Sequence, residues 1–260
     1  MYDTHITDSQ FRNLSDIVYK VSGISLNDNK KNLLKARLAK RLRSTRTATV
    51  SDYIRLIEKD GDEFKRFIDG ITTNHTYFFR ENRHCEYILE AMNPSNLLKI
   101  WSAASSSGEE AYSIAIQLLE NHFNFKIFAS DISDTMIQTA IRGVYPLERA
   151  RAVPPHLLRK YFQKGVNHSS GRIRVKDHVK DHVTFGKYNL VTGAPPLSEY
   201  HIIFCRNVMI YFDLPTKQKV MNDMVKALKP GGLFIFGQSE SMVGIKTPLV
   251  TLSPSIYRKP

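Results

Sequence analysis

The chain has 260 residues, of which 42% are hydrophobic, and a formal net charge of +12. This size and composition favour one large or two modest globular domains and exclude a disordered chain. No apolar run approaches the roughly twenty residues of a membrane span, and the first residues lack a signal-peptide pattern. Because the two cysteines have neither a disulfide framework nor metal-ligand spacing, we expect a cytoplasmic protein without a metal, and the charge predicts an acidic partner.

Residues 1–70 are predicted to form a basic, all-helical domain. One helix begins near Asp8 and stops near Gly23, a second opens at Ser51, and a third ends near Gly70. Between the first two, residues 30–46, from Lys30 to Arg46, contain eight basic residues and no acidic one, while leucine recurs every four positions. This pattern predicts an amphipathic helix. A charge run is ordinarily a solvated face, but the absence of an acid favours a binding role, and the lack of aromatics argues against nucleic acid.

Residues 71–97 are interpreted as a linker or clamp. The part from 72 to 81 is dense in aromatic and hydrogen-bonding residues, too polar for a core strand, and contains Arg80, which never loses its charge. The alternative is a connector whose aromatic side chains pack between domains.

From residue 98 onward, strand and helix patterns alternate, which predicts an α/β domain over residues 98–260 with a mostly parallel sheet. Candidate strands are residues 98–101, 126–130, 201–205 and 232–237, and candidate helices are 109–121, 135–141 and 216–228. At about residues 162–185 we expect an inserted β element, because Gly165 and Gly171 bracket a turn-rich loop before an alternating strand.

Residues 100–115 read as a strand, a turn of small residues and a helix with an acidic first turn. About twenty residues later, Asp131 ends a second strand, where a carboxylate can accept hydrogen bonds from both ribose hydroxyls of an adenosine. The turn has only Gly108 and no lysine, unlike loops that bind pyrophosphate or triphosphate. With Glu109 and Glu110 beside it, the turn suits S-adenosylmethionine, which has an amino acid end and a positive centre. The alternative is an ordinary turn with a capping box of Ser107 and Glu110.

A second polar site follows the predicted strand 201–205, which runs directly into Arg206 and Asn207. Ligands of open α/β sheets bind outside the carboxyl ends of the strands, so we expect site residues here as well.

Five ordered blocks of the sequence match the pattern of one known family. They are residues 73–81, 106–113, 129–132, 203–213, and 229–232 with 237–241. Over nearly its whole length the chain therefore resembles the CheR family of chemotaxis receptor methyltransferases. The resemblance implies a Rossmann-like class I S-adenosylmethionine-dependent methyltransferase domain, a small helical N-terminal domain and a small inserted antiparallel β subdomain. It also implies methyl transfer to glutamate carboxylates of chemoreceptor helices, forming methyl esters for adaptation. Ala111 and Ser133 depart from the usual proline and aspartate.

The resemblance also implies a set of site residues. Cofactor contacts fall on Asn74, Thr76, Arg80, Glu110, Asp131, Asn189, Leu190, Arg206 and Asn207. Asp131 is expected to hold the ribose, and Asn189 with Leu190 the adenine. Arg80 and Tyr211 are the candidate catalytic residues near the transferring methyl group, and the cofactor leaves as S-adenosylhomocysteine.

The basic segment 30–46 gains a partner from the resemblance, namely the acidic helical bundle of a chemoreceptor cytoplasmic domain. The β insertion is expected either to hold a C-terminal receptor peptide by strand addition or to be an edge protected by charge. We expect a monomer that binds no nucleic acid and inserts into no membrane. Two alternatives stay open: a cofactor-binding signalling module without turnover, and a nucleic-acid methyltransferase. The latter is disfavoured because residues 194–197 lack the polar and aromatic members that flank a flipped base.

Overall fold

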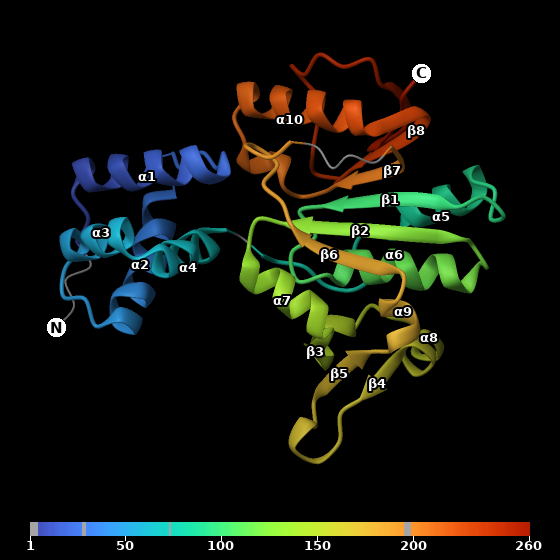
Figure 1. Cartoon of the computed structure of the whole chain (residues 1–260), viewed down its shortest axis with the longest axis horizontal. Helices are drawn as coiled ribbons and strands as arrows, with labels where there is room; N and C mark the ends of the chain where they lie inside the picture. The colour runs from blue at the N-terminus through green and yellow to red at the C-terminus, as the bar shows by residue number, and fades with distance from the viewer. Residues whose placement is uncertain (1–4, 28–29, 73, 195–198) are drawn as a thin grey trace. The chain divides into compact units, whose positions relative to one another are not determined.

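The computed structural model describes residues 5–27, 30–72, 74–194 and 199–260 (Figure 1). Thr73 and most of the stretch 194–197, which the sequence analysis used, lie outside the described residues. The chain divides into two compact units, one of Met1–Thr73 with Tyr211–Thr216 and the other of Asn74–Ile210 with Lys217–Pro260. None of the helices in the described ranges combines the length and apolarity needed to cross a membrane.

The first unit contains four helices, α1 (Asp8–Ser22), α2 (Lys31–Thr45), α3 (Val50–Lys59) and α4 (Gly61–Ile71). Thr7 caps α1 in a capping box, and Gly23 ends it in the left-handed conformation. Thr49, one position before the first residue of α3, caps that helix in place of the expected Ser51. The leucines spaced every four residues along α2 are all buried, so the predicted apolar stripe forms the core of this unit.

A short segment from much later in the chain belongs to the first unit. Ser25 donates its backbone N–H to the carbonyl of Tyr211 at 3.0 Å, and Ile24 forms an antiparallel bridge with Phe212. The hydroxyl of Tyr19 donates to Asp213 at 2.8 Å. These contacts explain why residues 211–216 cluster with the helical unit.

The second unit is built on a seven-stranded sheet of order β6-β2-β1-β7-β8-β10-β9. Its strands are β1 (Leu98–Ala103), β2 (Phe125–Asp131), β6 (Val183–Lys187), β7 (Tyr200–Cys205), β8 (Leu228–Phe236), β9 (Val250–Ser253) and β10 (Ile256–Arg258). The first five are parallel, and β10 and β9 complete the sheet in antiparallel pairs. This confirms the mostly parallel α/β sheet. Strand order reverses beside β1, which has β2 on one side and β7 on the other, and such switch points bind ligands.

The helices of this unit include the three that the sequence predicted and several that it did not. They are α5 (Arg83–Ala91), α6 (Glu109–Glu120), α7 (Asp134–Arg142), α8 (Pro155–Tyr161), α9 (Asp177–Lys180) and α10 (Leu214–Ala227), with short 3₁₀ turns at Leu147–Ala150, Asn167–Ser169 and Met209–Tyr211. The capping box of Ser107 and Glu110, which was the alternative interpretation of this turn, does not form. Gly108 is its N-cap with no side-chain hydrogen bond, and the Ser107 hydroxyl donates to Glu109 instead.

The inserted antiparallel subdomain is confirmed as a three-stranded sheet of order β3-β5-β4. It consists of β3 (Val144–Pro146), β4 (Phe162–Lys164) and β5 (Arg172–Val175) and extends away from the main sheet (Figure 1). The expected range 162–185 left out β3, and its last part forms β6 of the main sheet.

Candidate functional site

The turn between β1 and α6 has a backbone that few sequences tolerate. Ala104, Ser106 and Gly108 all have positive φ, of 59°, 50° and 93°, the left-handed region that non-glycine residues seldom adopt. A Cβ on Gly108 would lie 2.8 Å from the Cβ of Ala140, so this position requires glycine. Strain of this kind persists where the surrounding structure enforces it, which is common at ligand sites.

Asp131 holds this turn at the carboxyl end of β2. Its Oδ2 accepts the backbone N–H of Ser106 at 2.8 Å, and its Oδ1 accepts that of Ser133 at 2.9 Å. A carboxylate has about four lone-pair sites and can accept further hydrogen bonds beyond these two. Asp131 therefore shapes the turn and also has the chemistry to accept ribose hydroxyls.

Asn189 and Leu190 follow β6 and lie next to Asp131 along the edge of the sheet. The backbone N–H of Tyr188 donates to the carbonyl of Asp131 at 2.9 Å, which fixes this neighbourhood. The side-chain oxygen of Asn189 accepts the backbone N–H of Val191 at 2.9 Å. Leu190 is buried. A side-chain amide next to an apolar side chain is the combination that the sequence analysis expected for the edge and face of an adenine.

Glu110 and Arg206 form an ion pair between the carboxyl ends of β1 and β7. Arg206 Nη1 lies 3.2 Å from Glu110 Oε2, and the hydroxyl of Ser102 donates to Glu110 at 2.7 Å. Burial raises the pKa of Glu110, while the Arg206 charge and the Ser102 hydroxyl oppose that rise. Glu109, in contrast, is buried and has a different ion-pair partner, Arg149, at 3.5 Å.

The segment before α5 carries Asn74, Thr76 and Arg80 and belongs to the second unit. Hydrogen bonds to backbone groups hold it in place there. Phe78 donates its backbone N–H to the carbonyl of Arg149 at 3.0 Å, and the Arg149 side chain donates to the carbonyl of Thr76. Its aromatic member Phe78 packs edge-on against Tyr145 and Phe162, within the second unit. Arg80 donates to the carbonyl of His75 at 2.8 Å.

Sequence reasoning missed two carboxylates that organise this region. Glu81 accepts from Arg206 Nη2 at 3.1 Å, from Asn207 Nδ2 at 3.4 Å and from the backbone N–H of Gln238 at 3.0 Å. Glu240 accepts four backbone N–H groups, from Asn207, Val208, Met209 and Gly237, at 2.7–3.0 Å. Both glutamates lie in sequence blocks that match the family pattern, residues 73–81 and 237–241. No short spacing marks either of them as a site residue, because their partners are distant in sequence.

Three buried polar atoms indicate that the region is built for a polar ligand. Five buried side-chain polar atoms of the described residues have no hydrogen-bond partner, and three of them are the hydroxyls of Ser105 and Ser106 and the Nε of Arg206. Buried polar groups nearly always have one. All three atoms follow β1 or β7, as does the Glu110–Arg206 ion pair, and Asp131 ends the neighbouring strand β2. The residues present therefore fit a nucleoside with an amino acid end.

Tyr211, the second candidate catalytic residue, clusters with the first unit. The Nζ of Lys30 lies 5.4 Å from the centroid of its ring, and its carbonyl accepts from Ser25. The other expected site residues all belong to the second unit.

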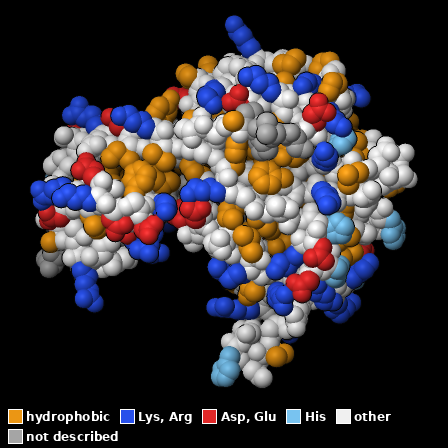
Figure 2. Space-filling view, viewed as in Figure 1, with side chains coloured by type: hydrophobic (Ala, Val, Ile, Leu, Met, Phe, Trp, Pro, Cys, Tyr) orange, Lys and Arg blue, Asp and Glu red, His pale blue; other side chains and the backbone are white. Residues whose placement is uncertain are grey.

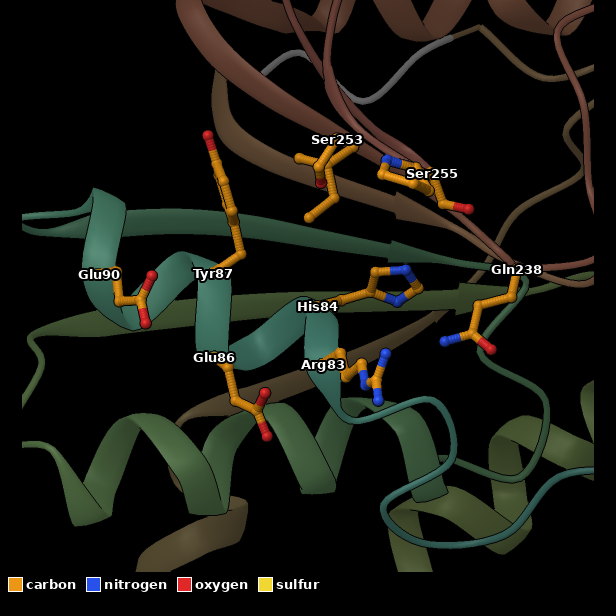
Figure 3. A pocket seen from close by; sticks show the side chains of 10 residues that line it. Arg83, His84, Glu86, Tyr87, Glu90, Gln238, Ser253 and Ser255 are labelled. Atoms are coloured by element: carbon orange, nitrogen blue, oxygen red, sulfur yellow. The ribbon is translucent and has the colours of Figure 1, made fainter.

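A separate pocket of about 530 Å³ opens between α5 and the turn from β9 to β10. Figure 3 shows His84 and Tyr87 projecting from α5 toward Ser253 and Ser255, with Gln238 at one end. Burial and the nearby Arg206 charge lower the pKa of His84 to about 4, so its imidazole is neutral at pH 7. Burial raises the pKa of the Cys85 thiol to about 12 and the pKa of the Cys205 thiol well above its usual value, which makes both poor nucleophiles.

Comparisons with known proteins identify the family. Residues 74–257 match the SAM binding domain of CheR methyltransferase, and residues 9–72 match its all-alpha domain. The chemotaxis protein methyltransferase 2 of Pseudomonas aeruginosa is 37% identical, with 97% of this chain and 94% of that protein covered. The chemotaxis protein methyltransferases of Escherichia coli and Borreliella burgdorferi are 35% and 36% identical over 97% and 98% of this chain and 91% and 95% of theirs. These matches confirm the expected class I methyltransferase fold, S-adenosylmethionine as cofactor and an enzyme of chemotaxis. The chain belongs to the CheR methyltransferase family.

Proposed function

We propose that the chain transfers the methyl group of S-adenosylmethionine to glutamate side chains of chemoreceptors through the site at the carboxyl ends of β1, β2, β6 and β7. The observation that carries this proposal is the network that joins Arg80, Glu81, Glu110 and Arg206. This network presents guanidinium and carboxylate groups beside Asp131, the carboxylate expected to bind the ribose. The amino acid end of the cofactor carries an ammonium and a carboxylate group, so it needs partners of both charges.

Each expected cofactor residue has a role in this proposal. Asp131 accepts the ribose hydroxyls, and Asn189 with Leu190 contacts the adenine. Glu110 binds the ammonium group, and Arg206 with Asn207 shapes the wall opposite it. Asn74 and Thr76 close the site from the segment before α5.

Arg80 has the donors needed to orient the attacking carboxylate. Arg206 already donates to the carbonyl of Arg80 and contacts two glutamates, whereas Arg80 donates to one carbonyl and lies 3.8 Å from Glu81. A guanidinium has five N–H donors in a planar fork that matches a carboxylate. We therefore assign Arg80 to the substrate and Arg206 to the architecture of the cofactor site. We keep Tyr211 as the second candidate catalytic residue, expected near the transferring methyl group.

The reaction needs orientation more than proton transfer. The bound cofactor supplies a methyl group on a positively charged sulfur. A glutamate side chain is ionised at pH 7, so no general base has to remove a proton. The task of Arg80 is to hold the carboxylate oxygen in line with the methyl group, in a site with little water.

The decisive assay measures base-labile methyl esters on a receptor cytoplasmic fragment incubated with labelled S-adenosylmethionine. We expect wild type to form them, and Arg80→Ala to lower kcat/KM roughly 100-fold with a smaller effect on S-adenosylhomocysteine affinity. Arg83→Ala is the matched control, because Arg83 is exposed on α5 and no ion pair involves it among the described residues. Cofactor binding without esters would favour a signalling module, and a base-stable label would contradict carboxylate methylation.

We also propose that α2 docks on the acidic receptor helices, although not through all its charges. Lys35, Arg37, Lys40 and Arg43 make no ion pair in the described part of the chain. Arg41 differs, because its Nε and Nη2 lie 2.8 and 2.5 Å from the carboxylate of buried Glu63. Acids from outside residues 30–46 therefore compensate part of this segment, Glu63 of α4 for Arg41 and Asp8 of α1 for Lys31. Figure 2 shows acidic side chains among the basic ones on the face of this unit.

Paired charge reversals test the docking surface. Lys40→Glu with Arg43→Glu should raise the KM for the receptor fragment at least tenfold at low salt, with a smaller difference at high salt, and leave cofactor affinity unchanged. The control is Lys99→Glu with Lys126→Glu, which makes the same charge change at exposed, adjacent positions of β1 and β2. Equal loss in both pairs would contradict docking through α2 and point to net charge alone.

A receptor peptide site on the inserted sheet is the remaining part of the proposal. A hollow of about 280 Å³ lies over β4 and β5 and is lined by Lys164, Arg172 and Arg174 among others. Because β4 is an edge strand, an extended acidic peptide could add to it. Fluorescence anisotropy with the receptor's C-terminal peptide should detect binding that Lys164→Glu weakens. Absence of binding would favour the alternative, in which the charges only protect an edge strand.

We expect the enzyme to act as a cytoplasmic monomer, and analytical ultracentrifugation of the purified protein can check the oligomeric state.

A further inference from the structure

Glu81 is the carboxylate that connects most of the segments around the proposed site. It lies between the guanidinium groups of Arg80 and Arg206, with Oε1 at 3.8 Å from Arg80 Nε and Oε2 at 3.1 Å from Arg206 Nη2. It also accepts from the side chain of Asn207 and the backbone of Gln238. One side chain therefore ties the segment before α5 to the carboxyl ends of β7 and β8.

The backbone of Glu81 is held in a conformation that its side chain does not favour. Its φ is 50°, and Phe79 two residues earlier has φ 62°. Left-handed backbone costs a non-glycine residue roughly 1 kcal/mol or more, so an ordinary turn here would favour glycine. The carboxylate contacts offset this cost, and they would be lost in a glycine variant.

We propose that Glu81 is a positioning residue that holds Arg206 so that Glu110 stays available to the cofactor's ammonium group. Arg206 Nη1 lies 3.2 Å from Glu110, and Nη2 lies 3.1 Å from Glu81, so the two carboxylates share one cation. Without Glu81, Arg206 pairs with Glu110 alone and repels Arg80. The ammonium group then competes with a full ion pair, and cofactor affinity falls.

This inference rests on the proposed cofactor site, and its tests separate the two. Glu81→Gln keeps size and backbone cost but removes the charge, whereas Glu81→Gly removes the charge and relieves the backbone. Both should bind S-adenosylhomocysteine roughly 10- to 100-fold more weakly than wild type, the effect of losing a hydrogen bond to a charged group. Glu86→Gln is the matched control, because Glu86 is exposed on α5 and no ion pair involves it among the described residues.

A second readout needs no cofactor. In the ligand-free protein, backbone amides of residues 76–82 and of Gln238 should exchange hydrogen faster in Glu81→Gly than in wild type, because Gln238 loses its acceptor. In turnover assays Glu81→Gln should change the KM for the cofactor far more than kcat. Glu81→Gly binding within twofold of wild type would overturn the inference. If wild type itself failed to bind S-adenosylhomocysteine, the cofactor site would be wrong, while faster exchange would still establish Glu81 as the connecting residue.

Discussion

Replacing Asp131 with asparagine separates the two tasks of this side chain. In the structure, each carboxylate oxygen accepts one backbone N–H, from Ser106 at 2.8 Å and Ser133 at 2.9 Å. Asparagine offers one oxygen and one NH₂ group, so one of the two buried amides loses its acceptor. Leaving a buried donor unsatisfied costs about 1–3 kcal/mol. For a domain of this size, that is a fall in melting temperature of roughly 2–12 °C.

The same substitution removes the charge that we expect to bind the ribose. A hydrogen bond to a charged group contributes about 1.5–3 kcal/mol, so S-adenosylhomocysteine should bind roughly 10- to 100-fold more weakly to Asp131→Asn. Isothermal titration calorimetry measures the affinity, and calorimetric melting of the ligand-free protein measures the stability.

Ser133→Ala is the matched control. The Ser133 hydroxyl accepts the backbone N–H of Met136 as the N-cap of α7, and losing such a cap costs about 0.5–2 kcal/mol. The control therefore loosens the same loop while leaving the carboxylate and the Ser133 backbone N–H in place. We expect lower stability with near wild-type affinity. Equal loss of affinity in both variants, or none in Asp131→Asn, would refute the ribose role.

Three further predictions concern other parts of the chain. Gly108→Ala should cost about 2 kcal/mol or more, because φ is 93° and the added Cβ lies 2.8 Å from Ala140; a melting temperature equal to that of wild type would contradict it. Glu63→Gln should destabilise the helical unit by about 1–3 kcal/mol, because Arg41 and Tyr53 lose their charged partner, and unfolding followed by circular dichroism should show this with cofactor affinity retained. The pKa of His84 is lowered to about 4, below its unfolded value of about 6.5, so its contribution to stability is present above pH 6.5 and lost as pH falls toward 4. His84→Asn should then flatten the pH dependence of melting between pH 6.5 and 4, and an unchanged slope would exclude His84 as its source.

The parts of the fold that the sequence predicted are those with local signals. The strand, turn and helix at residues 98–120 and the acid at Asp131 follow from apolar runs and a fixed spacing along the chain. The leucine stripe of α2 is a local pattern too, and its burial is confirmed. Helix α5 was missed because its N-cap, Asn82, makes no side-chain cap and no glycine marks its end.

The contacts that complete the site were beyond sequence reasoning because their partners are far apart. Glu81 and Arg206 are separated by 125 positions, and Glu81 and Gln238 by 157. No periodicity connects such residues, and only the pairing of β7 with β1 and of β8 with β7 brings them together. The acid that pairs with Arg41 was missed for the same reason, since Glu63 lies 22 residues away on α4.

Burial divides the basic residues of this chain into two groups with different consequences. Arg41, Arg149 and Arg206 each contact a glutamate that is largely withdrawn from water, so their charges are already used inside the protein. Removing one partner of such a pair leaves the other uncompensated, and stability or site geometry suffers. Lys40 and Arg43 are exposed on α2, and only charges of this second kind can attract an acidic receptor. The buried pairs already cancel within the net charge of +12, so the excess positive charge that a partner encounters comes from the exposed residues. The salt dependence of receptor binding should follow variants of the exposed group alone, whereas Arg41→Lys should change the unfolding of the helical unit and leave that salt dependence as it is.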